Sequence, residues 1–215
     1  MMKNRWKRRR LSSSQIIMLG FMGVIALGTI LLMLPFARAD AGGAPFLDAL
    51  FTATSATCVT GLITQDTATY WSAFGQTVIL ILIQIGGLGV VTVAVFITRL
   101  SGRKIGLMQR STMQEAIAAP QMGGIIRMTG FILRMVVIIE GIGALALLPV
   151  LIPEFGVGRG IWYAVFHAIS SFCNAGFDLM GIKEPYSSLT SYTGSAAVNV
   201  IVMLLIVVGG IGFLT

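Results

Sequence analysis

The chain has 215 residues, of which 56% are hydrophobic and only 11% carry a charge. A soluble domain usually carries about a quarter charged residues to cover its surface, so this composition excludes an ordinary soluble domain. The formal net charge of +7 would suit a nucleic-acid-binding protein. Twelve of the fifteen lysines and arginines, however, lie in two clusters that flank apolar runs, which favours a membrane protein with basic cytoplasmic segments.

The first element is a basic tail, residues 1–15, with six lysines and arginines among its first ten residues. The positive-inside rule predicts a cytoplasmic tail, and its cations would contact anionic lipid at about 1 kcal/mol each. Nucleic-acid binding is the disfavoured alternative, because the tail directly precedes an apolar run. That run is too long for the apolar region of a cleaved signal peptide.

Four apolar stretches follow, and a membrane-spanning helix needs roughly 20 such residues. No charge occurs in 11–37, 67–98 or 185–215, and 135–152 contains a single charge, Glu140. We therefore predict four transmembrane helices. The second basic cluster places the linker 99–127 in the cytoplasm, and six of the eight acidic residues then lie in outward-facing segments. The prediction is a multi-pass plasma-membrane protein with a cytoplasmic N-terminus.

An internal repeat is the most informative feature of the sequence. Residues 51–62 and 166–177 have Phe, Ala, Ser, Cys and Gly in common at one offset of 115 residues. A Gly-Gly-x-Gly segment at 86–89 recurs at 209–212, at an offset of 123. The offset thus grows by eight residues between the two motifs, which indicates an insertion around 183–192. Since both copies begin on the cytoplasmic side, the repeats are parallel: repeat 1 covers 16–98 and repeat 2 covers 128–215.

Each repeat contains a loop between its two spans that ends in glycine. In the first copy, residues 45–57 predict a helix too short to cross a bilayer, with a proline at its start, where the missing N–H costs little. Non-helical backbone at membrane depth is tolerated only when it is buried in protein or lines a water-filled cavity. A half-helix directs its carbonyl end at the membrane centre, and the segment after it can present carbonyl oxygens to a dehydrated cation. The predicted fold class is therefore an all-α membrane protein with four transmembrane helices and two re-entrant half-helices.

An ordinary extracellular loop is the competing interpretation, and the repetition of the pattern argues against it. The pore interpretation requires Gly61 and Gly176 to lie around a common axis rather than on unrelated faces.

These segments resemble the Trk/Ktr/HKT superfamily of potassium transport subunits, in particular the bacterial Ktr type. The resemblance is carried by residues 52–62, 170–177 and 74–89 and extends over essentially the whole chain. It implies a span–loop–span unit used four times around a central pore, with one filter glycine in each loop. The filter residues that it implies, together with the adjoining cysteines, are Cys58, Val59, Thr60, Gly61, Leu62, Cys173, Asn174, Ala175, Gly176 and Phe177. It also implies a dimer in the membrane and a cytosolic nucleotide-binding regulatory subunit.

The function expected from these features is potassium transport, with K⁺ as the transported ion and no bound cofactor. A sodium-permeable or sodium-coupled transporter is the alternative within transport, and a non-conducting membrane assembly subunit is the alternative outside it. Two repeats do not enclose a four-fold filter, so we expect an N-terminal part of a longer subunit or the assembly of several copies. No enzymatic activity is expected, because motifs such as Gly-x-Ser-x-Gly and His-Glu-x-x-His do not occur in the sequence.

Three further features have structural interpretations that we prefer. Glu140 lies inside a predicted span, where we favour pairing with a neighbouring span over a role in ion transit. The single histidine, His167, is expected to pack or to form a hydrogen bond. Residues 104–119 could form an amphipathic helix that docks a cytosolic partner, with a solvated loop as the equal alternative.

Overall fold

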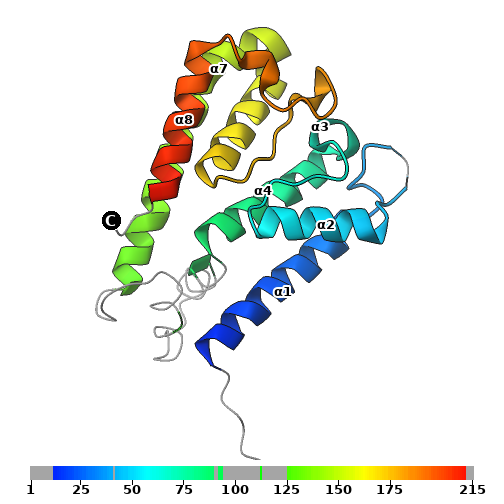
Figure 1. Ribbon diagram of the computed structural model, residues 1–215, viewed down its shortest axis with the longest axis vertical. Coiled ribbons are helices and arrows are strands. Elements are labelled where there is room, and N and C mark those ends of the chain that lie inside the picture. The colour runs from blue at the N-terminus through cyan, green and yellow to red at the C-terminus, as the bar shows by residue number, and fades with distance from the viewer. Residues whose placement is uncertain (1–11, 41, 90–91, 94–111, 113–124, 212–215) are drawn as a thin grey trace, which may run out of the picture.

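A computed structural model describes residues 12–40, 42–89, 92–93, 112 and 125–211 of the chain. Within these ranges the chain forms helices and no strand; one isolated bridge pairs Arg38 with Trp71. The helices are α1 (Ser13–Leu32), α2 (Phe46–Thr57), α3 (Thr67–Tyr70), α4 (Ala73–Leu88), α7 (Ile125–Phe172) and α8 (Ala196–Ile211), with short 3₁₀ turns η1 (Met180–Ile182) and η2 (Thr190–Tyr192) (Figure 1). The predicted all-α class is therefore confirmed for the described residues.

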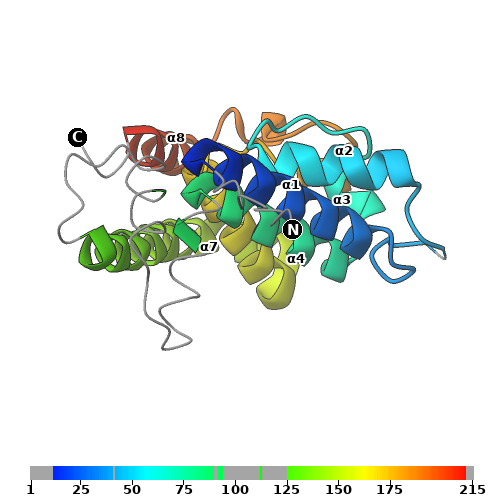
Figure 2. The ribbon, with the colours of Figure 1, turned by 90° about the horizontal axis from the view of Figure 1, so that it is seen from below.

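The first three longer helices, α1, α2 and α4, pack on one another. Ser12 begins α1 through a capping box with Gln15, in which each side chain bonds the backbone of the other residue. A glycine allows α1 to approach α4 closely, since a Cβ at Gly28 would lie 2.7 Å from a methyl carbon of Leu82. The short helix α2 lies across these two helices, as Figures 1 and 2 show. Its bounds match the predicted half-helix, with Pro45 at the N-cap.

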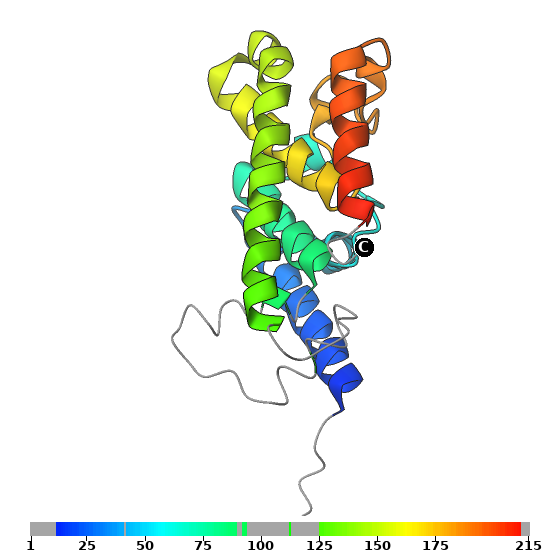
Figure 3. The same ribbon diagram turned by 90° about the vertical axis from the view of Figure 1, so that its left-hand side faces the viewer.

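Helix α7 contains a reversal of the chain. Its 48 residues include non-helical backbone at Gly156, with φ +79° and ψ 168°, shortly after Pro149 and Pro153. Proline removes a helical hydrogen bond, and glycine adopts positive φ at no steric cost, so the two together turn the helix back on itself. Residues 125–155 therefore form one ascending helix and residues 157–172 a second one that returns toward the centre (Figure 3).

The apolar helices differ in length. Within the described part of the chain, two segments are long and apolar enough to cross a membrane, α1 and Thr129–Phe172 of α7. The other two predicted spans are represented by α4 and α8, apolar helices of 16 residues each. At 1.5 Å per residue, 16 residues cover about 24 Å. Large apolar side chains on the apolar helices are exposed. Among them are Val137 and Leu145 of α7, which are 68% and 67% exposed, as expected for surfaces that contact lipid.

Polar side chains join the two halves of the chain along α4. The indole N–H of Trp162, on the descending part of α7, donates to the side-chain oxygen of Gln76, 2.8 Å away. The amide group of Gln76 donates in turn to backbone carbonyls around α3, including that of Trp71 at 3.1 Å. The Trp162–Gln76 bond connects residues 86 apart in sequence, so the second half-helix is held against the first repeat.

Parts of the predicted organisation fall outside the described residues. These are most of the basic tail 1–15, almost all of the linker 99–127, and residues 212–215 at the end of the second repeat. The predicted amphipathic helix 104–119 also lies outside them, apart from Thr112.

Candidate functional site

The two loops that follow the half-helices have the same backbone conformation. Val59 and Asn174 both adopt φ +56°, and Gly61 and Gly176 adopt φ +74° and +73°. Both pairs are 115 residues apart, the offset of the sequence repeat. Positive φ is uncommon outside glycine and is strained for a β-branched side chain. A matching left-handed residue at two equivalent positions therefore indicates the same local structure, although only five of twelve residues are identical.

The backbone hydrogen bonds of the two loops also correspond one to one. In each loop three successive N–H groups after the half-helix bond to carbonyls in its last turn. The pairs are Cys58–Thr54 (2.8 Å), Val59–Ala56 (3.3 Å) and Thr60–Ser55 (2.9 Å) in the first loop, and Cys173–Ile169 (2.9 Å), Asn174–Ser171 (3.1 Å) and Ala175–Ser170 (2.8 Å) in the second. Because the N–H groups bond back to the half-helix, this turn fixes the direction in which each loop leaves it.

The two glycines lie against each other. A Cβ added to Gly61 would come within 2.6 Å of the carbonyl oxygen of Ala175 and 3.1 Å of the Cα atom of Gly176. A Cβ added to Gly176 would lie 3.3 Å from the Cα atom of Gly61. Glycine is favoured at both positions for two reasons. The backbone has positive φ, and the two backbones approach each other closely. The loops share one location, as the pore interpretation requires.

The double glycines of α4 and α8 receive the carbonyl ends of the two half-helices. A Cβ at Gly86 would overlap the carbonyl oxygen of Thr57, and a Cβ at Gly209 would overlap that of Phe172. Thr57 and Phe172 are themselves equivalent at the offset of 115. Small residues permit this close packing between helices in membranes. The first glycine of each Gly-Gly-x-Gly segment thus serves close packing of a half-helix against α4 or α8.

The next glycine makes a contact between the repeats. A Cβ at Gly87 would lie 2.6 Å from the sulfur of Cys173, which is buried. Cys58, its equivalent in the first loop, is exposed. The two cysteines occupy equivalent positions of the repeat, but only Cys173 is a packing residue.

Side-chain hydrogen bonds connect each loop to the half-helix that precedes it. Ser170 donates to the carbonyl oxygen of Phe177 at 2.6 Å, and Thr60 donates to the hydroxyl oxygen of Ser55 at 2.9 Å. His167 is buried and its Nδ1 lies 2.7 Å from the carbonyl oxygen of Tyr163. Its Nε2 accepts from the N–H of Leu179 at 3.3 Å, so the histidine has the structural hydrogen-bonding role expected.

The loops offer a cation neutral oxygen atoms. Among the described residues no group of three or more His, Cys, Asp or Glu side chains could hold a metal ion. The atoms of segments 58–62 and 173–177 that suit a cation are backbone carbonyl oxygens, the hydroxyl of Thr60 and the side-chain oxygen of Asn174. Such ligands suit a weakly hydrated monovalent cation better than a divalent one.

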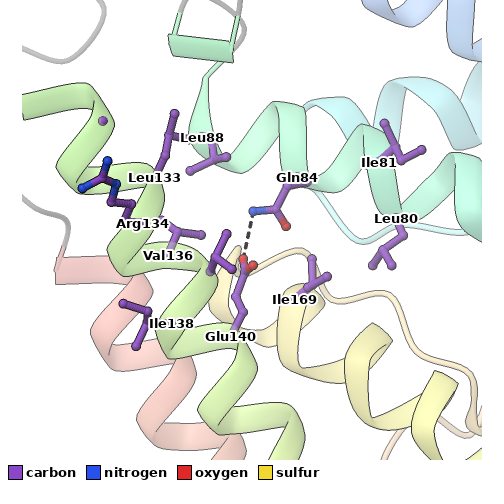
Figure 4. Close-up of a pocket in the computed structure, with 12 residues that line it drawn as sticks. Leu80, Ile81, Gln84, Leu88, Leu133, Arg134, Val136, Ile138, Glu140 and Ile169 are labelled. Carbon is purple, nitrogen blue, oxygen red and sulfur yellow. Dashed lines mark hydrogen bonds between the residues drawn. The ribbon is translucent and has the colours of Figure 1, made fainter. Parts of the chain in front are cut away.

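Glu140 is paired within the helix bundle. It is 7% exposed and accepts a hydrogen bond of 2.9 Å from the amide of Gln84 on α4. The pair lies at a cavity of about 960 Å³ between α4 and α7 whose lining is otherwise mostly apolar. Figure 4 shows Arg134 pointing away from this pair. Glu140 thus pairs with a neighbouring helix, the structural role preferred from the sequence.

The sequence matches the TrkH family of cation transport proteins over residues 4–214. The chain belongs to this family. The resemblance to the Trk and Ktr potassium transport subunits is thereby confirmed, and membership makes the chain a membrane protein. The family is defined by cation transport, in line with the expectation of a transporter rather than an enzyme.

Curated relatives of this TrkH family chain cover it almost completely. It is 45% identical over 207 residues to the potassium/sodium uptake protein NtpJ of Enterococcus hirae, covering 96% of this chain and 45% of the relative. It is 45% identical over 204 residues to the Ktr system potassium uptake protein B of Bacillus subtilis, covering 95% and 44%. The corresponding protein of Vibrio alginolyticus is 35% identical over 199 residues, covering 93% and 42%. The chain therefore spans less than half the length of these relatives.

The sequence did not indicate which residues hold the two loops together beyond their glycines. The structure assigns such contacts to Asp66, Gly181 and Tyr186. The only available signal was the eight-residue change of offset, which marked 183–192 as an addition to the second repeat.

Proposed function

We propose that this chain contributes a potassium-selective pathway across the membrane, in which backbone carbonyls of residues 58–62 and 173–177 replace the water shell of the ion. The observation that carries the proposal is the shared left-handed backbone at 59 and 61 and at 174 and 176, with Gly61 and Gly176 in contact. An ordinary pair of loops has no physical reason to repeat a strained conformation at equivalent positions and to meet there.

The chemistry follows from the direction of the backbone. Each half-helix ends in carbonyl groups that carry partial negative charge, and this favours a cation just beyond its C-terminus. In each loop two positive-φ residues are separated by one residue that lacks positive φ. This alternation turns successive carbonyls, so that several oxygens of one short segment can coordinate one ion. The filter residues proposed are Cys58, Val59, Thr60, Gly61, Leu62, Cys173, Asn174, Ala175, Gly176 and Phe177.

The proposed architecture is two parallel span–loop–span repeats, 16–98 and 128–215, joined by a cytoplasmic linker and preceded by a cytoplasmic tail. It is supported by the one-to-one hydrogen bonds of the two loops and by the equivalent glycine contacts of α4 and α8. Two loops supply half of a four-fold filter. The other half would come from further repeats of the same polypeptide or from a second copy.

The ion and the partners are proposed from the relatives. One is named for potassium and sodium uptake and others for potassium uptake in Ktr systems. Potassium is the proposed substrate, with sodium as the alternative or coupling ion. A cytosolic nucleotide-binding subunit is the proposed regulatory partner, and the lipid bilayer is the surrounding partner.

The test is potassium uptake by cells that lack their own uptake systems, with the complete natural reading frame expressed. Gly61→Ala and Gly176→Ala should each abolish uptake while the protein remains in the membrane, because each added Cβ meets backbone of the other loop. Gly141→Ala is the matched control, since no described atom outside its own stretch of helix lies within 4 Å of its added Cβ. Uptake at the level of the unmodified protein in Gly61→Ala would contradict the filter assignment, and sodium uptake without potassium uptake in the unmodified protein would favour the sodium alternative.

A further inference from the structure

The insertion at 183–192 distinguishes the second repeat from the first. The offset between the repeats is 115 residues before it and 123 after it. The structure shows this segment and the adjoining turn η1 beside α3 of the first repeat, in Figure 1 and in the contacts between these elements. The inserted residues therefore connect the two repeats, although they belong to only one of them.

Asp66 is the centre of this connection. Its side chain is buried, with 6% of the residue exposed. One carboxylate oxygen accepts three hydrogen bonds within the first repeat, from the N–H of Ala68 (3.0 Å), the N–H of Thr69 (2.9 Å) and the hydroxyl of Thr69 (2.9 Å). The other accepts the backbone N–H of Tyr186 at 3.0 Å, from 120 residues away. One carboxylate thus holds α3 and the inserted segment at the same time.

Gly181 provides the space that the carboxylate of Asp66 fills. A Cβ at Gly181 would overlap that carboxylate. Gly181 is also the residue equivalent to Asp66 at the offset of 115. At this position the first repeat has the acidic Asp66, and the second has Gly181, whose lack of a side chain leaves room for the carboxylate. Two aspartates here would repel each other, so the pair is complementary rather than symmetric.

The backbone of the inserted segment is shaped for this contact. Tyr186 adopts φ +62°, a conformation uncommon for a residue other than glycine. At one end of the insertion, Lys183 forms an ion pair with Glu154 of α7. At the other end, the hydroxyl of Tyr192 donates to the same carboxylate. Burial and the adjacent Glu154 raise the pKa of the Tyr192 hydroxyl, which keeps it protonated as a donor. The insertion is thereby anchored to α7 at both ends and to Asp66 in the middle.

We infer that Asp66 is a positioning residue for the ion-binding loops, acting across the repeats through Tyr186 and Gly181. Asp66 and Gly181 each lie five residues after a loop glycine. The loops are thus joined at Gly61–Gly176 and again at Asp66–Gly181, and two joined points fix both their separation and their relative tilt. The inference rests on the proposed filter, because carbonyl separation matters for selectivity only if the carbonyls coordinate the ion.

Asp66→Asn and Gly181→Ala test this inference in the complete natural reading frame. Asn at 66 can still accept from Ala68 and Thr69, but its amide group then faces the N–H of Tyr186. In Gly181→Ala the added methyl group displaces the carboxylate. We expect either change to raise the apparent KM for K⁺ by about tenfold, the order expected from losing a hydrogen bond to a buried charge. Inhibition by Na⁺ should increase, while the maximal rate per membrane-inserted protein changes little.

The double variant separates one shared contact from two independent defects. Since both substitutions remove the same interaction, the double variant should be no worse than the more affected single variant, both in KM and in the unfolding temperature of the purified protein. Gly194→Ala serves as the control, because among the described residues no neighbouring atom lies within 4 Å of the added Cβ. It should transport like the unmodified protein.

Two outcomes would overturn the inference. One is an unchanged KM and unchanged Na⁺ inhibition in Asp66→Asn and Gly181→Ala, with only the amount of folded protein reduced. The other is additive effects in the double variant. Neither outcome affects the proposed filter, which fails separately if Gly61→Ala transports normally.

Discussion

The two loops have the same backbone but different surroundings. Cys58, at the start of the first loop, is exposed, whereas Cys173, at the start of the second, is buried against Gly87 of the first repeat. The first loop continues directly into α3 and α4, and the second continues into an insertion that returns to the first repeat. The backbone conformation that would coordinate an ion and its packing against the glycines of α4 and α8 are thus duplicated, whereas the contacts of the two cysteines and of the segments that follow the loops are not. This is the difference expected when function depends on main-chain oxygens and packing depends on side chains.

The largest effect should come from breaking the packing that both repeats share. Gly86→Ala and Gly209→Ala should each destabilise the protein by about 3 kcal/mol, since the new methyl group overlaps a backbone carbonyl that a helix holds in place. Thermal unfolding of the purified protein measures this, with Gly141→Ala as the control. A large loss in only one of the two variants would contradict the equivalence of the repeats.

A smaller effect is expected from a contact that exists only between the repeats. Gln84 donates to Glu140, and the offset of 123 places Val207 at the position equivalent to Gln84. Gln84→Ala should lower the free energy of unfolding by about 2 kcal/mol, because the buried Glu140 loses this donor. Thermal unfolding of the purified protein measures this change.

Glu140→Gln tests whether the carboxylate serves structure or ion transit. It keeps an acceptor for Gln84, so stability and potassium uptake should remain close to those of the unmodified protein. Abolished uptake at normal expression would instead assign Glu140 to ion transit.

A difference between the loops is expected when glycine replaces their left-handed residues. Val59→Gly should stabilise the protein by about 1 kcal/mol, because a β-branched residue at positive φ is strained and glycine is not. Asn174→Gly should not increase the stability. Asparagine already tolerates this conformation, so glycine relieves little strain, and the change also removes the bond from the Asn174 amide to the carbonyl oxygen of Ile206 at 3.3 Å. Equal shifts in unfolding temperature would show that the side chains at these positions do not matter.

The smallest perturbation is chemical labelling of the two cysteines. A hydrophilic maleimide should label Cys58 in a Cys173→Ala variant and leave Cys173 unlabelled in a Cys58→Ala variant, because thiol reactivity requires access. The fraction labelled can be measured by mass spectrometry of the intact protein. Equal labelling would mean that the loops are equally accessible, contrary to the structure.

Much of the fold was predictable because its signals are local. The apolar runs, the proline before Phe46 and the glycines at 61 and 176 each act through neighbouring residues. They gave the first half-helix to within one residue. The ends of the longer helices differ from those of the apolar runs by up to 11 residues, since α8 begins at Ala196 and the run begins at 185. A turn between the predicted span 135–152 and the second loop was implied by the span–loop–span unit, but its position at Gly156 was not predicted, although Pro149, Pro153 and Gly156 are residue types that interrupt a helix. The left-handed Val59 was not predicted either, because valine prefers extended backbone.

By itself the sequence determined that this is a helical membrane protein, that it contains one unit twice, and that glycine ends each loop, because composition, period and residue type are properties of the chain alone. Only the tertiary structure decided that Gly61 lies against Gly176, that Gln84 pairs with Glu140, and that Asp66 occupies the space left by Gly181. These pairs are 56 or more residues apart. Their complementarity arises from shape and hydrogen bonding after the helices have packed. The repeat offset of 115 relates Gly61 to Gly176 and Asp66 to Gly181, but it does not by itself place either pair in contact.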